Sequence, residues 1–235
     1  SPYKNSNRPS SCIMATLTVL DKDGNEIDKW TSVKGEPHII KRLHVGETYI
    51  LREEFAPYGY LKAEEVEFTI TDTAEIQKVE MKDDVPIGRI IINKKGEFLS
   101  EVSWNDMVAG AMDSIWGYVT GSLKDVTFEI YAREDIKAAD GESDDYYKKD
   151  ELVATIKTDE LGIARTDDLP LGKYYVVEKE TADGFVLDGE PRDIDLTYRD
   201  QDTPVVTFDS EWQNSRQKAK VIVTKKEKDS DRVLE

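Results

Sequence analysis

The stretch Tyr174-Tyr-Val-Val-Glu-Lys-Glu-Thr-Ala-Asp-Gly-Phe185 decides how this chain is organised. Its side chains alternate as in a strand, Glu178 stands in the middle, and a tight turn follows at Asp183-Gly184. The same pattern occurs once earlier, as Tyr49-Ile-Leu-Arg-Glu-Glu-Phe-Ala-Pro-Tyr-Gly-Tyr60. Matching the two stretches pairs four positions: Glu53 with Glu178, Ala56 with Thr181, Gly59 with Gly184, and Tyr60 with Phe185. The repeat predicts two copies of one domain type, each with an acidic residue on a strand before a turn.

The composition is that of a folded chain with an acidic surface. Of the 235 residues, 34% are charged and 38% are hydrophobic, and the formal net charge is −17. This charge argues against nucleic acid as a partner, because binding to phosphates needs a cationic surface. It also argues against contact of this fragment with an anionic membrane, and no run approaches the roughly 18 apolar residues of a membrane helix. Acidity by itself indicates only solubility.

Few residues are available for metal or nucleophilic chemistry. Cys12 is the only cysteine, and His38 and His44 are the only histidines. The chain therefore cannot form an internal disulfide or a cysteine-based zinc site, and we expect no metal and no cofactor. A hydrolase of the Ser-His-Asp or Cys-His type is disfavoured for the same reason.

Short strands separated by turns fill the first part of the chain. The segments Ala15–Leu20, Pro37–Arg42 and Ile76–Met81 are examples of the strands we expect between residues 15 and 82. Strands at such close spacing, without a helical period, are typical of an antiparallel sandwich. The first domain is expected at 1–85, with a short linker around Pro86.

The second domain is expected at 86–217, and residues 218–235 repeat its first strand, as if a third copy began there. Near 101–121 the strand pattern breaks, and four residues fall near helical spacing: Met107, Ala111, Ile115 and Tyr118. We interpret this insertion as a short helix that ends at Gly121. Its apolar face either packs on the domain or, with Trp104 and Trp116, forms a binding surface.

Two motifs carry a family resemblance. They are Gly46-Glu-Thr-Tyr-Ile-Leu-Arg-Glu-Glu-Phe-Ala-Pro-Tyr-Gly-Tyr60 and Leu171-Gly-Lys-Tyr-Tyr-Val-Val-Glu178. Both resemble tandem Cna-B-type, or SpaA-like (prealbumin-like), domains of Gram-positive surface adhesins and pilins. The resemblance covers nearly all of the chain except the insertion. It implies an all-β fold of tandem Ig-like antiparallel sandwiches.

In that family a lysine on the first strand and an Asn or Asp on the last strand form an intramolecular isopeptide bond, which a glutamate promotes. For the second domain the resemblance implies Lys94 and Asn214 as the joined residues and Glu178 as the catalytic one. Lys95 is the rival to Lys94, although strand parity favours Lys94. One departure is Ala182, where the family usually has proline.

The first domain matches less completely. Its motif supplies Glu53, and the acceptor is Asp83 or, alternatively, Asp84. Lys4 falls at the spacing expected for the donor, although the residues around it depart from the usual pattern. Lys225 would be the donor of a third domain and should be unreacted here.

Such a bond needs a neutral amine. Burial disfavours charge, so it lowers the pKa of a lysine and raises that of a glutamate. A protonated glutamate can donate to the carbonyl oxygen and pass a proton to the leaving ammonia or water. The alternative is a buried ion pair with hydrogen bonds and no covalent bond.

The resemblance implies a structural stalk or pilin-type module, extracellular and anchored to the cell wall through regions outside this fragment. Self-crosslinking happens once, so the chain is not expected to be a turnover enzyme. Its partners would be neighbouring domains of the same surface protein. The alternative is an adhesin module that binds a host protein or glycan through the 101–121 insertion and loops, since aromatic anchors dominate interfaces.

Overall fold

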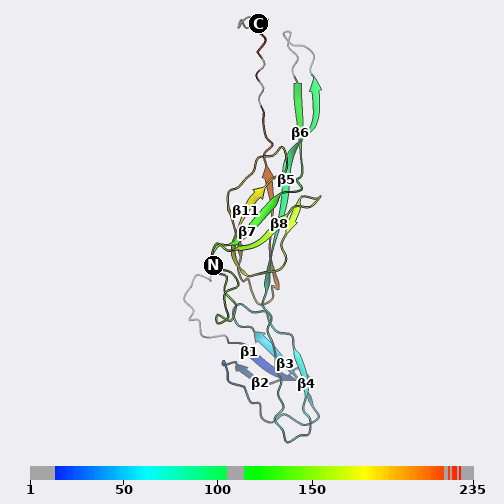
Figure 1. The fold of residues 1–235 in the computed structure, drawn as a ribbon. Helices are drawn as coiled ribbons and strands as arrows, with labels where there is room; N and C mark the ends of the chain where they lie inside the picture. Colours follow the sequence, from blue (N-terminus) through cyan, green and yellow to red (C-terminus); the bar gives the residue numbers. More distant parts are fainter. Residues whose placement is uncertain (1–13, 105–113, 220–221, 223, 227, 229–235) are drawn as a thin grey trace, which may run out of the picture.

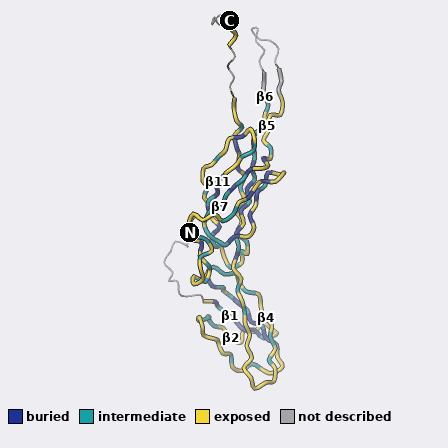
Figure 2. The backbone as a smooth tube through the Cα atoms, viewed as in Figure 1, coloured by how far each residue is buried: buried dark blue, intermediate teal, exposed yellow. Residues whose placement is uncertain are grey.

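The computed structural model describes residues 14–104, 114–219, 222, 224–226 and 228, and side chains are described except at 102–104 and 114–116. Its strands form two bodies stacked along one long axis, with a two-stranded ribbon extending from the far end of the second (Figure 1). Buried residues run through the inside of both bodies (Figure 2). No helix among the described residues is long and apolar enough to cross a membrane.

The first body is one four-stranded antiparallel sheet. Its strands β1 (Thr16–Asp21), β2 (Glu26–Thr31), β3 (Thr48–Phe55) and β4 (Val66–Thr69) pair in the order β2-β1-β3-β4. Gly24, with a φ of 83°, makes the turn between β1 and β2, as the Asp-Gly signal predicts. The buried core is small: Val19, Tyr49 and Leu51 form it, with partly buried neighbours around them.

The second body has two facing sheets. One contains β7 (Thr127–Ala132), β8 (Leu152–Lys157), β11 (Gly172–Glu180) and β12 (Arg192–Leu196), in the order β12-β11-β7-β8. The other contains β5 (Ile87–Trp104), β6 (Ser114–Ser122), β9 (Ile163–Arg165), β10 (Leu169–Pro170) and β13 (Val205–Asn214). Alternating residues of both sheets point into a shared core, which includes Ile90, Ile92, Phe128, Ile130 and Val176.

The expectation of a purely antiparallel fold is wrong at one pair of strands. The first and last strands of the second body, β5 and β13, run parallel, from Val205 opposite Ile87 to Asn214 opposite Gly96. Parallel neighbours need a long crossover, and here the rest of the domain supplies it. The chain consequently enters and leaves this sheet in the same direction.

The prediction of a helix near 101–121 is wrong for the described part of the insertion. There β5 continues to Trp104 and pairs with β6 as a ribbon, from Lys95 opposite Ser122 to Trp104 opposite Ser114. Ile, Trp, Tyr, Val and Thr make up more than half of β6 and favour a strand, which outweighs the apparent helical spacing. Met107 and Ala111 lie outside the described residues, and so do the side chains of Trp104, Ile115 and Trp116.

Two other expected strands are not formed. The segments Pro37–Arg42 and Ile76–Met81 have no strand, and Ile76 is 87% exposed. Proline has no N–H to donate to a ladder, which weakens the first segment as a strand. In residues 218–228, the described positions are exposed and form no strand.

Gly162 offers a test of how tightly the second body is packed around Lys94. Its φ is +75°, and a Cβ there would lie 2.6 Å from the carbonyl oxygen of Lys94 and 3.0 Å from the amide nitrogen of Leu123. Gly141 has a similar φ of +68° with nothing within 4 Å. Gly141→Ala should therefore lower the free energy of unfolding by about 1–2 kcal/mol, through backbone strain alone. Gly162→Ala should cost about 1–3 kcal/mol more, through overpacking. Denaturant unfolding of both variants measures the difference, and equal losses would contradict the packing described here.

Candidate functional site

Three polar side chains predicted from the sequence meet in the core of the second body. Lys94 is on β5, Asn214 is the last residue of β13, and Glu178 is on β11 in the facing sheet. All three are buried, with exposed fractions of 1%, 1% and 3%. Because Lys94 and Asn214 sit on neighbouring parallel strands, while Glu178 faces them, the site lies between the two sheets.

Glu178 bridges the other two residues. Its Oε2 lies 2.6 Å from Lys94 Nζ, which makes a buried ion pair. Its Oε1 accepts a hydrogen bond from Asn214 Nδ2. The same Nδ2 donates to Thr181 Oγ1 at 2.8 Å, whereas Asn214 Oδ1 has no partner among the described residues. The amide nitrogen of Asn214 therefore faces Glu178. From the sequence we expected the opposite orientation, with the carbonyl oxygen of Asn214 accepting a hydrogen bond from Glu178.

The surroundings of Lys94 are apolar. Its Nζ lies 5.7 Å from the centre of the Phe128 ring, which contacts Trp212 edge-on at 5.6 Å. Burial lowers the pKa of Lys94, and the negative charge of Glu178 offsets only part of that effect. A lysine in such a place is closer to its neutral, nucleophilic form than an exposed one.

The structure also separates the rival lysines. Lys95, the next residue on β5, points to the other side of the strand, and its Nζ lies 3.3 Å from Ser122 Oγ at the base of the ribbon. Strand alternation explains this, since neighbouring side chains point to opposite faces. Only Lys94 is brought to Glu178 and Asn214.

Glu53 of the first body is the counterpart of Glu178. It is 1% exposed on β3, and its Oε2 accepts a hydrogen bond from the Ala63 amide at 2.7 Å. Burial raises the pKa of Glu53 most, and the nearby charge of Asp83 raises it further. Burial also raises the pKa of Asp83, which is half-buried, whereas the alternative acceptor Asp84 is exposed. Lys4 lies outside the described residues, and Lys225 is exposed.

The role of Thr181 as the second acceptor for Asn214 was not predicted from the sequence, although the repeat shows a difference between the two copies at this position. Position 181 is matched by Ala56 in the first copy, so the two copies differ where the hydroxyl is needed. Phe128 and Trp212, whose aromatic rings line the site, were not predicted either. An aromatic residue on a strand does not reveal from sequence alone what it covers.

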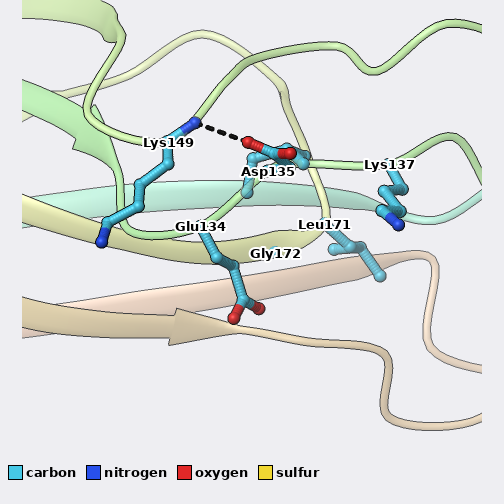
Figure 3. A pocket seen from close by; sticks show the side chains of 7 residues that line it. Glu134, Asp135, Lys137, Lys149, Leu171 and Gly172 are labelled. Atoms are coloured by element: carbon cyan, nitrogen blue, oxygen red, sulfur yellow. Dashed lines mark hydrogen bonds between the residues drawn. The ribbon is translucent and has the colours of Figure 1, made fainter.

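One surface depression is a separate feature. It has a volume of about 610 Å³, and Figure 3 shows its charged wall, where the Lys149 amide donates to Asp135 Oδ1 at 2.9 Å. Glu134, Lys137 and Leu171 also line it, and none of its lining residues belongs to the site around Lys94. Among the described residues no group of three or more His, Cys, Asp or Glu is placed to hold a metal ion.

Comparison with solved structures gives overall similarities at low identity. The Bacillus anthracis TIE protein is 21% identical, with a TM-score of 0.47, over 85% of this chain and 30% of its own. The minor pilin GBS52 of Streptococcus agalactiae is 13% identical, with a TM-score of 0.36, over 92% and 88% of the two chains. The shaft pilin SpaA of Lactobacillus rhamnosus GG is 10% identical, with a TM-score of 0.34, over 88% and 89%. Scores this low carry no functional argument.

The family assignment comes from the sequence match to a domain family. No curated protein matches the chain significantly. The family model of the SpaA prealbumin-like fold domain, however, matches residues 13–85 and 118–212, which together make up most of the chain. Each matched range contains one copy of the repeated glutamate motif, with Glu53 in the first and Glu178 in the second. The chain therefore belongs to the SpaA prealbumin-like fold domain family, of which it contains two copies.

Proposed function

We propose that this chain is a load-bearing segment of a Gram-positive cell-surface protein, and that its second domain closes itself with a Lys94–Asn214 isopeptide bond. The observation that carries the proposal is the burial of Lys94, Glu178 and Asn214 together between the two sheets. Burying a lysine and a carboxylate costs stability even when the two are paired. Formation of a covalent bond would explain why the chain keeps them there.

The chemistry follows from the contacts. The carboxylate of Glu178 takes a proton from Lys94 Nζ, 2.6 Å away, and leaves a neutral amine. The amine attacks Cγ of Asn214, a C–N bond forms, and the bond from Cγ to Nδ2 breaks. Glu178 returns the proton to Nδ2, which already contacts it, so that ammonia leaves. The carboxylate then takes the second proton that Nζ loses as it becomes the amide nitrogen, so Glu178 ends protonated. Fixed neighbours make the attack intramolecular, with effective molarities of about 10⁵ M or more.

A bond at this place would change how the domain carries force. Lys94 and Asn214 lie on the first and last strands, which are parallel neighbours. A pull that enters along β5 would cross the bond and leave after Asn214, so that residues 95–213 carry no load. Residues 95–213 would therefore be protected from unfolding under force. A disulfide cannot do this within the chain, because it has a single cysteine.

The first domain is proposed to use Glu53 in the same way, with Asp83 as acceptor and Lys4 as donor, releasing water. The buried Glu53 and its electrostatic contact with Asp83 support this. Ala56 has no hydroxyl, so the Glu53 site of the first domain has fewer contacts than the Glu178 site of the second domain, where Thr181 binds Asn214. Within this proposal neither domain turns over a substrate.

An adhesive role for the ribbon is a second candidate. Four large apolar side chains are exposed near its base: Phe98, Leu99, Tyr118 and Val119. Apolar patches of this kind often mark interaction sites. Binding of the chain to host matrix proteins and glycans, lost when Leu99 and Val119 are both changed to Glu, would support this role. Binding that is equal in the double variant would exclude the ribbon as the adhesive surface.

The covalent bond is tested by the intact mass of the denatured chain. We expect a mass lower than that of the sequence by one ammonia if only the second domain is closed, and by one further water if the first is closed too. Lys94→Ala and Glu178→Ala should each restore the ammonia, while Lys95→Ala should leave the deficit in place because Lys95 does not reach the site. An unchanged mass in the natural chain would mean that the three residues form only a buried polar network.

Loss of the bond should also lower stability. In Asn214→Ala the second domain should lose up to about 5 kcal/mol, by analogy with a disulfide that closes a loop of similar length. Differential scanning calorimetry should show a large downward shift of the second-domain transition, while the first-domain transition stays in place. A shift no larger than that of Gln213→Ala, an exposed neighbour on the same strand, would contradict the crosslink.

The first domain should respond to pH in a defined direction. Glu53 and Asp83 both have pKa values raised by burial. A carboxyl with a raised pKa in the folded state stabilises fully below its unfolded value, and this contribution is lost as pH rises through the folded value. Amide exchange at Val19 should therefore report decreasing stability from about pH 4 upward. Glu53→Gln should flatten this dependence, and an unchanged slope in that variant would show that Glu53 is not its source.

A further inference from the structure

One glutamine of the second domain, in the loop between β12 and β13, binds several backbone groups of the first domain. Gln201 Oε1 accepts a hydrogen bond from the Ala56 amide at 2.8 Å, and the Gln201 carbonyl oxygen accepts one from the Lys62 amide at 2.9 Å. Its Nε2 also lies 3.4 Å from the carbonyl oxygen of Glu54. One residue of the second domain thus binds backbone groups near both ends of the segment 54–62.

Neighbouring contacts hold the same segment. Tyr198 donates its hydroxyl to the carbonyl oxygen of Tyr60 at 3.1 Å, and its ring meets that of Tyr58 edge-on at 4.8 Å. Hydrogen bonds within the loop that carries Gln201 hold its shape. Asp200 Oδ1 accepts a hydrogen bond from the Asp202 amide at 2.9 Å and another from the Thr203 hydroxyl at 2.8 Å. The loop therefore presents Gln201 in a shape that does not depend on the first domain.

The segment 54–62 is the one that surrounds the Glu53 site. Glu53 immediately precedes it, Ala63 immediately follows it, and the Ala63 amide donates to Glu53 Oε2 at 2.7 Å. In the second domain Thr181 supports the corresponding site from within the domain. In the first domain Ala56 takes that position, and its backbone amide is bound by Gln201 instead.

We propose that Gln201 is a positioning residue for the Glu53 carboxyl group, so that the site of the first domain is completed by the second. By fixing Glu54 and Ala56 through its side chain, Gln201 keeps Glu53 in place to bind the Ala63 amide and keeps water away from the carboxyl. Only the functional meaning of this arrangement rests on the proposed role of Glu53 in bond formation. The small core of the first domain fits such dependence.

The test compares the whole chain with Gln201→Ala in two measurements. Amide hydrogen exchange should lose protection by about tenfold or more at Ala56, which loses its acceptor, and also at Ala63, which Gln201 does not touch. Carbon NMR of the Glu53 carboxyl should show its pKa falling toward the ordinary value as water enters. Asp83 and Lys62, the charged groups that act on Glu53, are unaltered by the substitution.

Two variants serve as controls. Gln201→Glu keeps an acceptor oxygen for the Ala56 amide and should restore protection at Ala56 and Ala63. Asp202→Ala changes a side chain of the same loop without removing a contact to the first domain, so both measurements should match the natural chain. Protection of Ile130 in the second-domain core should stay constant in every variant, which shows that the fold is intact.

The proposal is overturned if Gln201→Ala exposes Ala56 while Ala63 and the pKa of Glu53 stay unchanged, because Gln201 would then only fasten the domains together. It is equally overturned if nothing changes. The intact mass of the same samples reports the covalent bonds separately. If the chain has no mass deficit but the pKa of Glu53 still changes in Gln201→Ala, the proposed isopeptide bond is wrong and the positioning role of Gln201 stands.

Discussion

The central interaction of the second domain is the contact between a lysine and a carboxylate that are buried between its two sheets. Lys94 and Glu178 can be buried only because the two sheets meet around them and the charges face each other. Aromatic rings at Phe128 and Trp212 exclude water from one side. The same exclusion lowers the pKa of the lysine, so its amine is closer to the neutral form than that of an exposed lysine.

The two copies handle the same glutamate differently. Around Glu178, the second domain supplies an amine, an amide and a hydroxyl from its own strands. Around Glu53, the described part of the first domain supplies one backbone amide, and a neighbouring domain holds the loop from outside. Duplicated domains that diverge in this way share a core motif but no longer stand alone to the same degree.

The sequence predicted what local pattern and repetition encode. The repeat marked the strands around Glu53 and Glu178. The family resemblance added Lys94 and Asn214, which the structure places beside Glu178. The parallel pairing of β5 and β13 was not reachable from periodicity, which is the same for both strand directions. The ribbon was mistaken for a helix because a few apolar residues matched both spacings. Gln201 carries no pattern at all, since its role arises from where two domains meet.

The parallel pairing of the first and last strands also sets an order of events. A chain that is made from its amino end presents β5 early and β13 only after the rest of the domain has followed. The site around Lys94 therefore cannot assemble before the chain has been made as far as β13. Contacts this distant along the chain form late in folding. The sheet that carries Lys94 is completed only when its last strand arrives.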